Sequence, residues 1–246
     1  MFSCEHAKMI HMYIRRNVVA LAVALLLVGT AQSAKAAPFA RADVAEPTAH
    51  VLASTNWSGY AVTGKFTGIK GTFTVPQTSK TDYGVVAEWV GIDGFANKDL
   101  IQCGVTETGG ITQAWWEILP GFSVPITWMK ISAGDQVEVS VRWEGTDQWS
   151  VVILDKATLQ TFHQVFTYNG PARSAEWVVE APSSIAGIDQ MAKYGETSWS
   201  ALTFLGNAHN MWSMWLVQGA KVVSIPSAVP NLTSLVANGF SVEYVG

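Results

Sequence analysis

Apolar and polar residues alternate most clearly over positions 136–143. Every second residue from Val137 to Trp143 is apolar, and the residues between them are polar. This period of two is typical of a β-strand with one dry face and one wet face. Shorter runs with strand-like patterning, separated by Gly, Pro, Asn and Asp, predict further strands at 71–75, 85–92, 100–106, 112–118, 149–155, 161–168, 174–180, 197–205 and 240–245.

The spacing of these predicted strands also indicates the fold class. No stretch shows a long amphipathic period of 3.6 residues, and the chain contains no internal repeat or low-complexity tract. Many strands at short spacing, with frequent turn residues between them, are typical of an all-β antiparallel sandwich. We place this β-sandwich domain at residues 55–246.

The first 54 residues do not share the strand pattern. Arg15 and Arg16 precede an uncharged apolar run at 18–30, and small residues then lead to an Ala-x-Ala site. These features predict a secretory signal peptide at 1–36, and the apolar run is too short for a comfortable membrane span. We therefore expect a secreted, extracellular protein that leaves the membrane after signal removal, in which residues 37–54 form a linker or short pro-segment.

Charge narrows the range of possible partners. The predicted signal peptide carries four of the 15 Lys and Arg residues and one of the 19 Asp and Glu residues. The remainder has 11 basic and 18 acidic residues, a formal net charge of −7. This balance disfavours nucleic acid and anionic membrane as partners. The composition, 49% hydrophobic and 14% charged, predicts a substantial core.

The cysteine and histidine residues argue against two kinds of site. Cys103 is the only cysteine after residue 36, so no disulfide can form within the mature chain. It shares strand parity with Ile101 and Val105, which predicts a buried thiol rather than a nucleophile. The remaining histidines are scattered, with no HExxH motif or Cys/His cluster. We therefore expect no metal site.

Polar residues recur on one side of three predicted strands, although common hydrolase signatures are absent. The chain has no Gly-x-Ser-x-Gly elbow and neither Asp-Thr-Gly nor Asp-Ser-Gly. Parity turns Trp177 and Val179 into the core and leaves other side chains on the opposite faces. Those side chains are Gln102 on one strand, Gln113, Trp115 and Glu117 on a second, and Glu176, Val178 and Glu180 on a third. From this pattern alone, a solvated sheet face remains as good an explanation as a functional site.

Five sequence blocks, in order along the chain, resemble those of the glutamic peptidases, also called eqolisins. They are Asn-Trp-Ser-Gly-Tyr at 56–60, Trp-Val-Gly-Ile-Asp-Gly at 89–94, Ile-Gln-Cys-Gly at 101–104, Ala-Trp-Trp-Glu at 114–117 and Ala-Glu-Trp-Val-Val-Glu at 175–180. The resemblance implies a concanavalin-like β-sandwich of two antiparallel sheets, with substrate lying across one concave face. It also implies acid endopeptidase activity. We expect the enzyme to act as a monomer on proteins or peptides and to need no metal or cofactor.

The catalytic pair that this resemblance implies is Glu176 and Gln102. Peptide hydrolysis needs a base for water, a hydrogen-bond donor for the oxyanion and an acid for the departing amine. Ionised Glu176 can take the water proton and later return it to nitrogen. The Gln102 amide can donate to the oxyanion while its carbonyl orients water or Glu176. A carboxyl near its ordinary pKa of about 4.3 works best in acidic solution.

The resemblance assigns supporting roles to neighbouring residues. Trp89 matches a substrate-contacting tryptophan, with core packing as the alternative. Asp93 matches an aspartate that we expect to fix a loop rather than act on substrate. Glu117, with Trp115 in the same block, is expected to support the site. Glu180 is expected to be a surface charge at the end of a strand.

Two other functions and one unexplained residue remain open. A concanavalin-like glycoside hydrolase would use Glu117 and Glu176 as paired carboxylates, and a lectin-like module would bind carbohydrate with the tryptophans. Gln102 distinguishes these functions, because a glycosidase with two carboxylates has no need of its amide. Glu88 stands where the family commonly has a small residue, and its parity points it towards the core without an evident reason.

Overall fold

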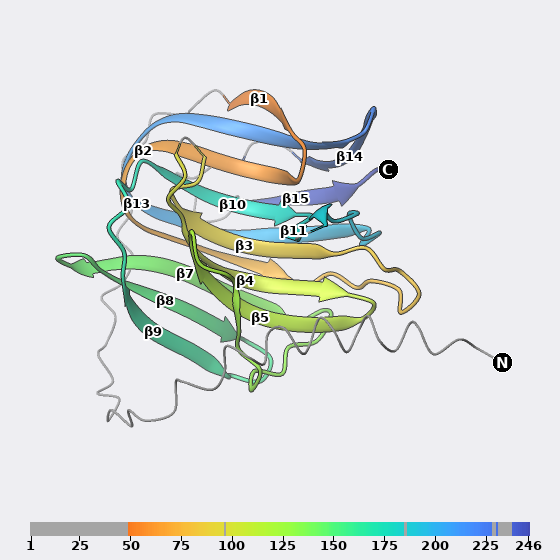
Figure 1. Cartoon of the computed structure of the whole chain (residues 1–246), viewed down its shortest axis with the longest axis horizontal. Helices are drawn as coiled ribbons and strands as arrows, with labels where there is room; N and C mark the ends of the chain where they lie inside the picture. The colour runs from red at the N-terminus through yellow and green to blue at the C-terminus, as the bar shows by residue number, and fades with distance from the viewer. Residues whose placement is uncertain (1–48, 96, 185, 228–229, 231–237) are drawn as a thin grey trace. The chain divides into compact units, whose positions relative to one another are not determined.

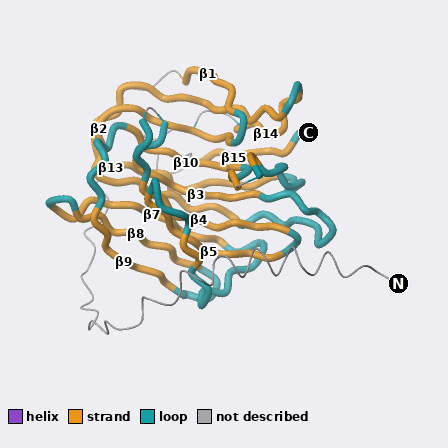
Figure 2. The backbone as a smooth tube through the Cα atoms, viewed as in Figure 1, coloured by secondary structure: helices purple, strands orange, loops and turns teal. Residues whose placement is uncertain are grey.

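The structure, a computed structural model, describes residues 49–95, 97–184, 186–227, 230 and 238–246. The predicted signal peptide and the first part of the expected linker lie outside these ranges. Strands joined by turns and loops make up the described part of the chain, and no helix occurs in it (Figure 2). Accordingly, the described ranges contain no helix that is long and apolar enough to cross a membrane. The prediction of an all-β fold is confirmed.

The strands vary widely in length, and two of them are much longer than the sequence pattern predicts. Their bounds are β1 Ala49–Ser54, β2 Trp57–Thr74, β3 Val86–Ile92, β4 Ile101–Thr108, β5 Ile111–Ile118, β6 Val124–Pro125, β7 Gln136–Gly145, β8 Gln148–Asp155, β9 Thr161–Thr167, β10 Ser174–Glu180, β11 Ser183–Ser184, β12 Gly187–Ile188, β13 Glu196–Gln218, β14 Lys221–Pro226 and β15 Gly239–Tyr244.

Two layers of strands form the sandwich, and the long strands β2 and β13 run through both. The first layer has the order β1-β13-β2-β10-β3-β4-β5-β6, and the second has the order β14-β15-β13-β2-β7-β8-β9. Figure 1 shows β10, β3, β4 and β5 side by side, with β7, β8 and β9 forming a second group. All of these pairings are antiparallel except that of β1 with β13. The predicted antiparallel sandwich is confirmed.

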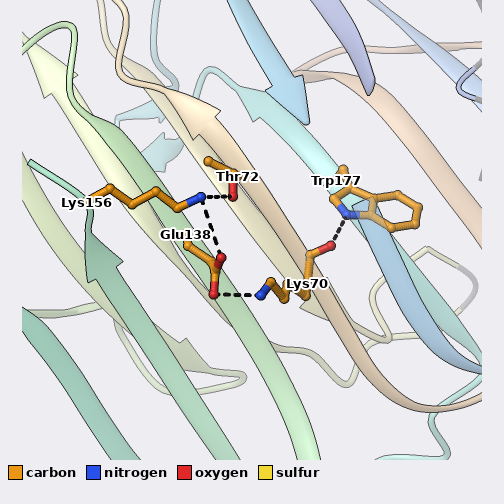
Figure 3. Close-up of polar contacts among 5 residues, drawn as sticks. All are labelled: Lys70, Thr72, Glu138, Lys156 and Trp177. Carbon is orange, nitrogen blue, oxygen red and sulfur yellow. Dashed lines mark hydrogen bonds and ion pairs between the residues drawn. The ribbon is translucent and has the colours of Figure 1, made fainter. Parts of the chain in front are cut away.

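The main core fills the space between the layers. Trp177, in β10 of the first layer, is fully buried, and its indole N–H donates to the backbone oxygen of Lys70 at 2.9 Å (Figure 3). On β2 and β7, Lys70 pairs with Glu138 at 2.7 Å and Lys156 lies 3.6 Å from the same carboxylate. Each such partly exposed ion pair stabilises the folded state by only about 0.2–1 kcal/mol. Apolar packing around Trp177 therefore does most to hold the two layers in place.

Two strands differ from the sequence pattern for identifiable reasons. Residues 49–54, expected to be the end of a linker, form β1, which pairs along the edge of β13. β13 extends far beyond the predicted segment at 197–205. The sequence pattern missed the rest of this strand because register shifts interrupt its alternation of apolar and polar residues. A pattern of period two therefore detects only the first part of β13, which itself contains one register shift, between Ser200 and Thr203.

Cys103 lies in the core, as its strand parity predicts. Its side chain is fully buried, and Sγ lies 3.7 Å from the backbone oxygen of Ser140 and 3.8 Å from that of Val152. Burial raises the pKa of the thiol well above its ordinary value, and the Ser140 contact lowers it only in part. The thiol is therefore both inaccessible and protonated.

We expect the Cys103 thiol of the mature chain to resist labelling until the protein unfolds. Thiol titration with an aromatic disulfide reagent should find about one reactive group per chain in denaturant and almost none in native buffer. A Cys103→Ala variant provides the blank for the reagent. Rapid labelling of the native protein would contradict the register that places Gln102 on the opposite face.

Candidate active site

Glu176, Gln102 and Glu117 lie in one row across neighbouring strands of the first layer. Glu176 of β10 pairs with Gly91 of β3, Gly91 pairs with Gln102 of β4, and Gln102 pairs with Glu117 of β5. Paired residues project from the same face of a sheet, so the three polar side chains share one surface. With strands about 4.8 Å apart, the backbones of Glu176 and Gln102 are separated by roughly 10 Å.

Gly91 occupies the position between the two predicted catalytic side chains. A Cβ atom there would lie 2.8 Å from a methyl group of Leu100 and 2.9 Å from the Trp89 ring. Neither approach is tolerated without a shift of the neighbouring side chain. Because β3 contributes no side chain at this point, Glu176 and Gln102 face each other across the strand.

The Gln102 side chain is held by Glu117. Its Nε2 donates to Glu117 Oε2 at 2.5 Å, and only 5% of the residue is exposed. Burial raises the pKa of the half-buried Glu117 carboxyl, while hydrogen bonds from Gln102 and from the Ser123 backbone lower it in part. Oε1 of Gln102 is buried without a partner in the described part of the chain. The contact with Glu117 therefore orients the amide and leaves its second N–H and its carbonyl for other groups.

Glu176 is almost completely buried, with 2% of its surface exposed. Neither carboxylate oxygen has a hydrogen bond to a described residue. Burial raises the pKa of this carboxyl well above its ordinary value, and the Asp93 charge raises it further. The Ser174 hydroxyl and the Phe95 backbone amide lie near enough to lower the pKa in part. This differs from the expected carboxyl of ordinary pKa: it makes ionised Glu176 a stronger base, and it lowers the fraction of the carboxyl that is ionised in acidic solution.

Asp93 fixes the loop that follows β3. Its carboxylate accepts hydrogen bonds from the Tyr168 hydroxyl and the backbone amides of Ala172 and Arg173, each at 2.7 Å, and from the Asn97 amide at 2.8 Å. Asp93 also has a backbone φ of 70°, a conformation that few residues other than glycine adopt. With both oxygens engaged and no exposed surface, Asp93 holds the segment before β10 against the loop after β3.

A second row beside the polar one carries the two tryptophans implied by the resemblance. Trp89 pairs with Gly104, and Gly104 pairs with Trp115, so both rings face the side of the sheet that carries Glu176. A Cβ on Gly104 would lie 2.5 Å from Trp89 Cβ, so this position admits no side chain. Trp89 and Trp115 are 7% and 8% exposed and belong to a small apolar cluster with Val178. They form the apolar floor beside the polar row.

Glu180, expected to be a surface charge at the end of a strand, is only partly exposed and is held by two hydrogen bonds. Its carboxylate accepts a hydrogen bond from Trp89 Nε1 at 2.7 Å and another from Asn56 Nδ2 at 2.6 Å. Burial raises the pKa of Glu180 to about 7, the Glu117 charge contributes to this rise, and both hydrogen bonds oppose it. Strand parity was the sequence signal for this environment. On β10, Glu180 shares a face of the sheet with Glu176, and that face also carries the Trp89 ring.

Sequence reasoning also missed an aromatic wall on the far side of Glu176. The Phe95 ring lies 6.3 Å from Trp57 and 5.7 Å from Trp212, and Trp212 lies 4.9 Å from His50. These four residues come from a loop and three different strands. No sequence spacing connects them, and only the pairing of β2, β13 and β1 brings them together.

The arrangement supplies a carboxyl that can exchange a proton, an amide donor facing it and an apolar floor. A carboxyl and an amide of this kind can activate water and stabilise an oxyanion. Among the described residues there is no group of three His, Cys, Asp or Glu side chains that could hold a metal ion.

The chain resembles known peptidases in both sequence and fold. It is 28% identical over 157 residues to scytalidopepsin B of Scytalidium lignicola, a match that covers 59% of this chain and 57% of the relative. It is 26% identical over 181 residues to aspergillopepsin-2 of Aspergillus niger, covering 60% of this chain and 63% of the relative. The matches thus span somewhat less than two thirds of each relative.

Solved structures share the fold of the described strands. The structure of scytalido-glutamic peptidase with a transition state analog inhibitor aligns with a TM-score of 0.69 at 21% identity, covering 78% of this chain and 98% of the other. Aspergilloglutamic peptidase from Aspergillus niger aligns with a TM-score of 0.53 at 24% identity, covering 66% and 99%. The sequence also matches the peptidase A4 family over residues 55–244, nearly the whole predicted domain. The resemblance to the glutamic peptidases is therefore confirmed, and the chain belongs to the peptidase A4 family.

Proposed function

We propose that the protein is a secreted acid endopeptidase in which Glu176 and Gln102 hydrolyse the peptide bond together. The observation that carries this proposal is the row Glu176–Gly91–Gln102, in which an unpartnered carboxyl faces an oriented amide across a glycine. Membership of the peptidase A4 family supports the same activity. Export rests on the features of residues 1–36, and we expect the exported protein to act as a monomer.

In the proposed reaction, the scissile carbonyl lies between the two side chains. Ionised Glu176 removes a proton from water, and the resulting hydroxide attacks the carbonyl carbon. The second N–H of Gln102 donates to the oxyanion that forms, while Glu117 keeps the amide in place. Protonated Glu176 then transfers its proton to the amide nitrogen as the C–N bond breaks. The same carboxyl thus serves as base and then as acid, and returns to its ionised form.

The geometry does not favour the glycosidase alternative. Glu117 and Glu176 are three strands apart, which separates their backbones by roughly 14 Å. The two carboxyls of a glycosidase lie about 5–9.5 Å apart and act directly across one bond, so side chains on strands this far apart would have to lean towards each other. Here, Gln102 stands between them in the row and its amide is bonded to Glu117.

We expect the protein to cleave denatured casein and oxidised insulin chains at acidic pH, and to release no reducing sugar from polysaccharides. Mass spectrometry of the fragments would show internal cleavage, and a Glu176→Gln variant would measure contaminating activity. A chelator, a thiol alkylator, a serine-directed phosphonate and pepstatin should each leave cleavage intact. Polysaccharide hydrolysis without proteolysis, or strong inhibition by any of the four reagents, would contradict the proposal.

A further inference from the structure

The polar row that contains Glu176 continues across the first layer to its edge strand. Glu176 pairs with Ala61 of β2, Ala61 pairs with Trp212 of β13, and Trp212 pairs with His50 of β1. Paired residues face the same side of a sheet, so His50 and Trp212 share the surface of the candidate active site. β1 precedes the family match, which begins at residue 55, so His50 lies outside the matched range.

The aromatic wall makes this extension a continuous surface. The Trp57 and Phe95 rings contact edge-on, Phe95 contacts Trp212, and Trp212 contacts the His50 imidazole with ring centroids 4.9 Å apart. Trp57 also packs against the apolar cluster of Trp89 and Val178 in the second row. His50 is exposed and stands at the outer end of this wall. A peptide that follows the row away from Glu176 would therefore pass over apolar rings and reach an accessible imidazole.

The distance along the row fits a bound peptide of ordinary length. Three steps between neighbouring strands separate Glu176 from His50, which is roughly 14 Å. An extended peptide advances about 3.3–3.6 Å per residue. A residue about four positions from the scissile bond would therefore lie beside His50.

We propose that His50 forms an outer subsite that binds an acidic side chain of the substrate about four residues from the scissile bond. This inference rests on the proposed peptidase function. An imidazole in contact with water is cationic in acidic solution. The Trp212 ring limits the positions that the imidazole can take. The subsite would thus supply a fixed positive charge at one end of the row, opposite the carboxyl of Glu117 at the other end.

Competition between matched peptides would test the subsite. The peptides would share one cleavage sequence, carry amidated C-termini and have cysteic acid, Gln or Lys at each position three to five residues from the scissile bond on either side. The sulfonate of cysteic acid stays ionised at pH 4, and amidation removes the terminal carboxylate as a second source of negative charge. We expect the wild type to prefer cysteic acid over Gln at one position by about two- to fivefold in kcat/KM, the range of an exposed ion pair.

Variants of His50 and of His163, another exposed histidine, would assign the preference for the acidic side chain to one residue. In His50→Gln the ratio of kcat/KM for the cysteic acid peptide to kcat/KM for the Gln peptide should fall to about one. In His50→Arg, which keeps a cation, this ratio should stay at the wild-type value. His163→Gln, on β9 of the second layer, should keep the wild-type ratio. Cleavage of all peptides at equal rates by the wild type, or an unchanged ratio in His50→Gln, would overturn the subsite while leaving the peptidase function intact. Failure to cleave any peptide would overturn both.

Discussion

A Glu176→Gln variant should lose about 10²–10⁴-fold in kcat while remaining folded. The substitution keeps the size of the side chain but removes the carboxyl that we propose takes a proton from water and returns it to nitrogen, and such catalysis contributes a factor of this size. Gln keeps an oxygen that can face the Ser174 hydroxyl and the Phe95 backbone amide, the two groups that lower the pKa of this carboxyl, so we expect the fold to tolerate the substitution. Turnover of a peptide substrate, with circular dichroism of each variant, measures both effects.

Variants of Gln102, the proposed partner of Glu176, test the same catalytic assignment. Gln102→Ala removes the proposed oxyanion donor and should cost about 10²–10³-fold in kcat. Because the two residues act on one transition state, the double variant should lose little beyond the worse single variant. Gln102→Glu should not rescue activity, since it adds a second titrating carboxyl beside Glu117 without a permanent N–H donor. If folded Glu176→Gln kept more than about a tenth of wild-type turnover, its role as the base would be excluded.

The second large effect concerns Glu88, whose replacement by Gln should extend the stability of the protein towards neutral pH. Glu88 is fully buried on the core face of β3, and both of its oxygens lack a partner among the described residues. Burial raises the pKa of its carboxyl well above the ordinary value, and the Glu107 charge raises it further. Glu107 itself accepts hydrogen bonds from the Thr78 amide and hydroxyl, at 2.7 and 2.8 Å.

The direction of the pH effect follows from the raised pKa. In the folded protein Glu88 holds its proton more tightly than in the unfolded chain, so its neutral form is tolerated below the unfolded pKa. As the pH rises towards the folded pKa, the folded state loses about 1.4 kcal/mol per pH unit relative to the unfolded state. Tyr194, the other titratable group affected by this carboxyl, binds Ser224 Oγ at 2.7 Å and supplies no positive charge. The burial of Glu88 is therefore expected to lower the free energy of unfolding as the pH rises from acidic towards neutral.

Urea unfolding at pH 4, 6 and 8 would measure this loss of stability. The free energy of unfolding of the wild type should fall steadily over this range, and that of Glu88→Gln should fall less. Glu138→Gln is a suitable control, because Glu138 is partly exposed and paired with Lys70 and Lys156. Parallel curves for the wild type and Glu88→Gln would show that the Glu88 carboxyl does not cause this loss.

Strand parity predicted the site wherever the pairing is regular. It placed Trp177 and Cys103 in the core and put Gln102 and Glu117 on the opposite face, where the structure joins them by a hydrogen bond. It also pointed Glu88 inwards, although nothing in the sequence shows that its oxygens lack partners. Parity gives the face of a side chain and says nothing of what covers that face.

The parts that could not be predicted depend on contacts between distant segments. Glu180 was taken for a surface charge because its neighbours Trp89 and Asn56 lie far away in the chain. The aromatic wall needs the full length of β13, whose register shifts hide its pattern. The raised pKa of Glu176 likewise depends on burial that no local spacing reveals.

The two strands shared by both layers determine when the protein can fold. β2 lies near the start of the domain, yet its partners β7, β10 and β13 all follow much later in the chain. Until β13 has been synthesised, β2 lacks a neighbouring strand at the centre of each layer. Pairings between strands so far apart in the chain also form slowly. A chain that stays unfolded until β13 is present can still pass through a narrow channel in an extended form, which is compatible with the export that we propose.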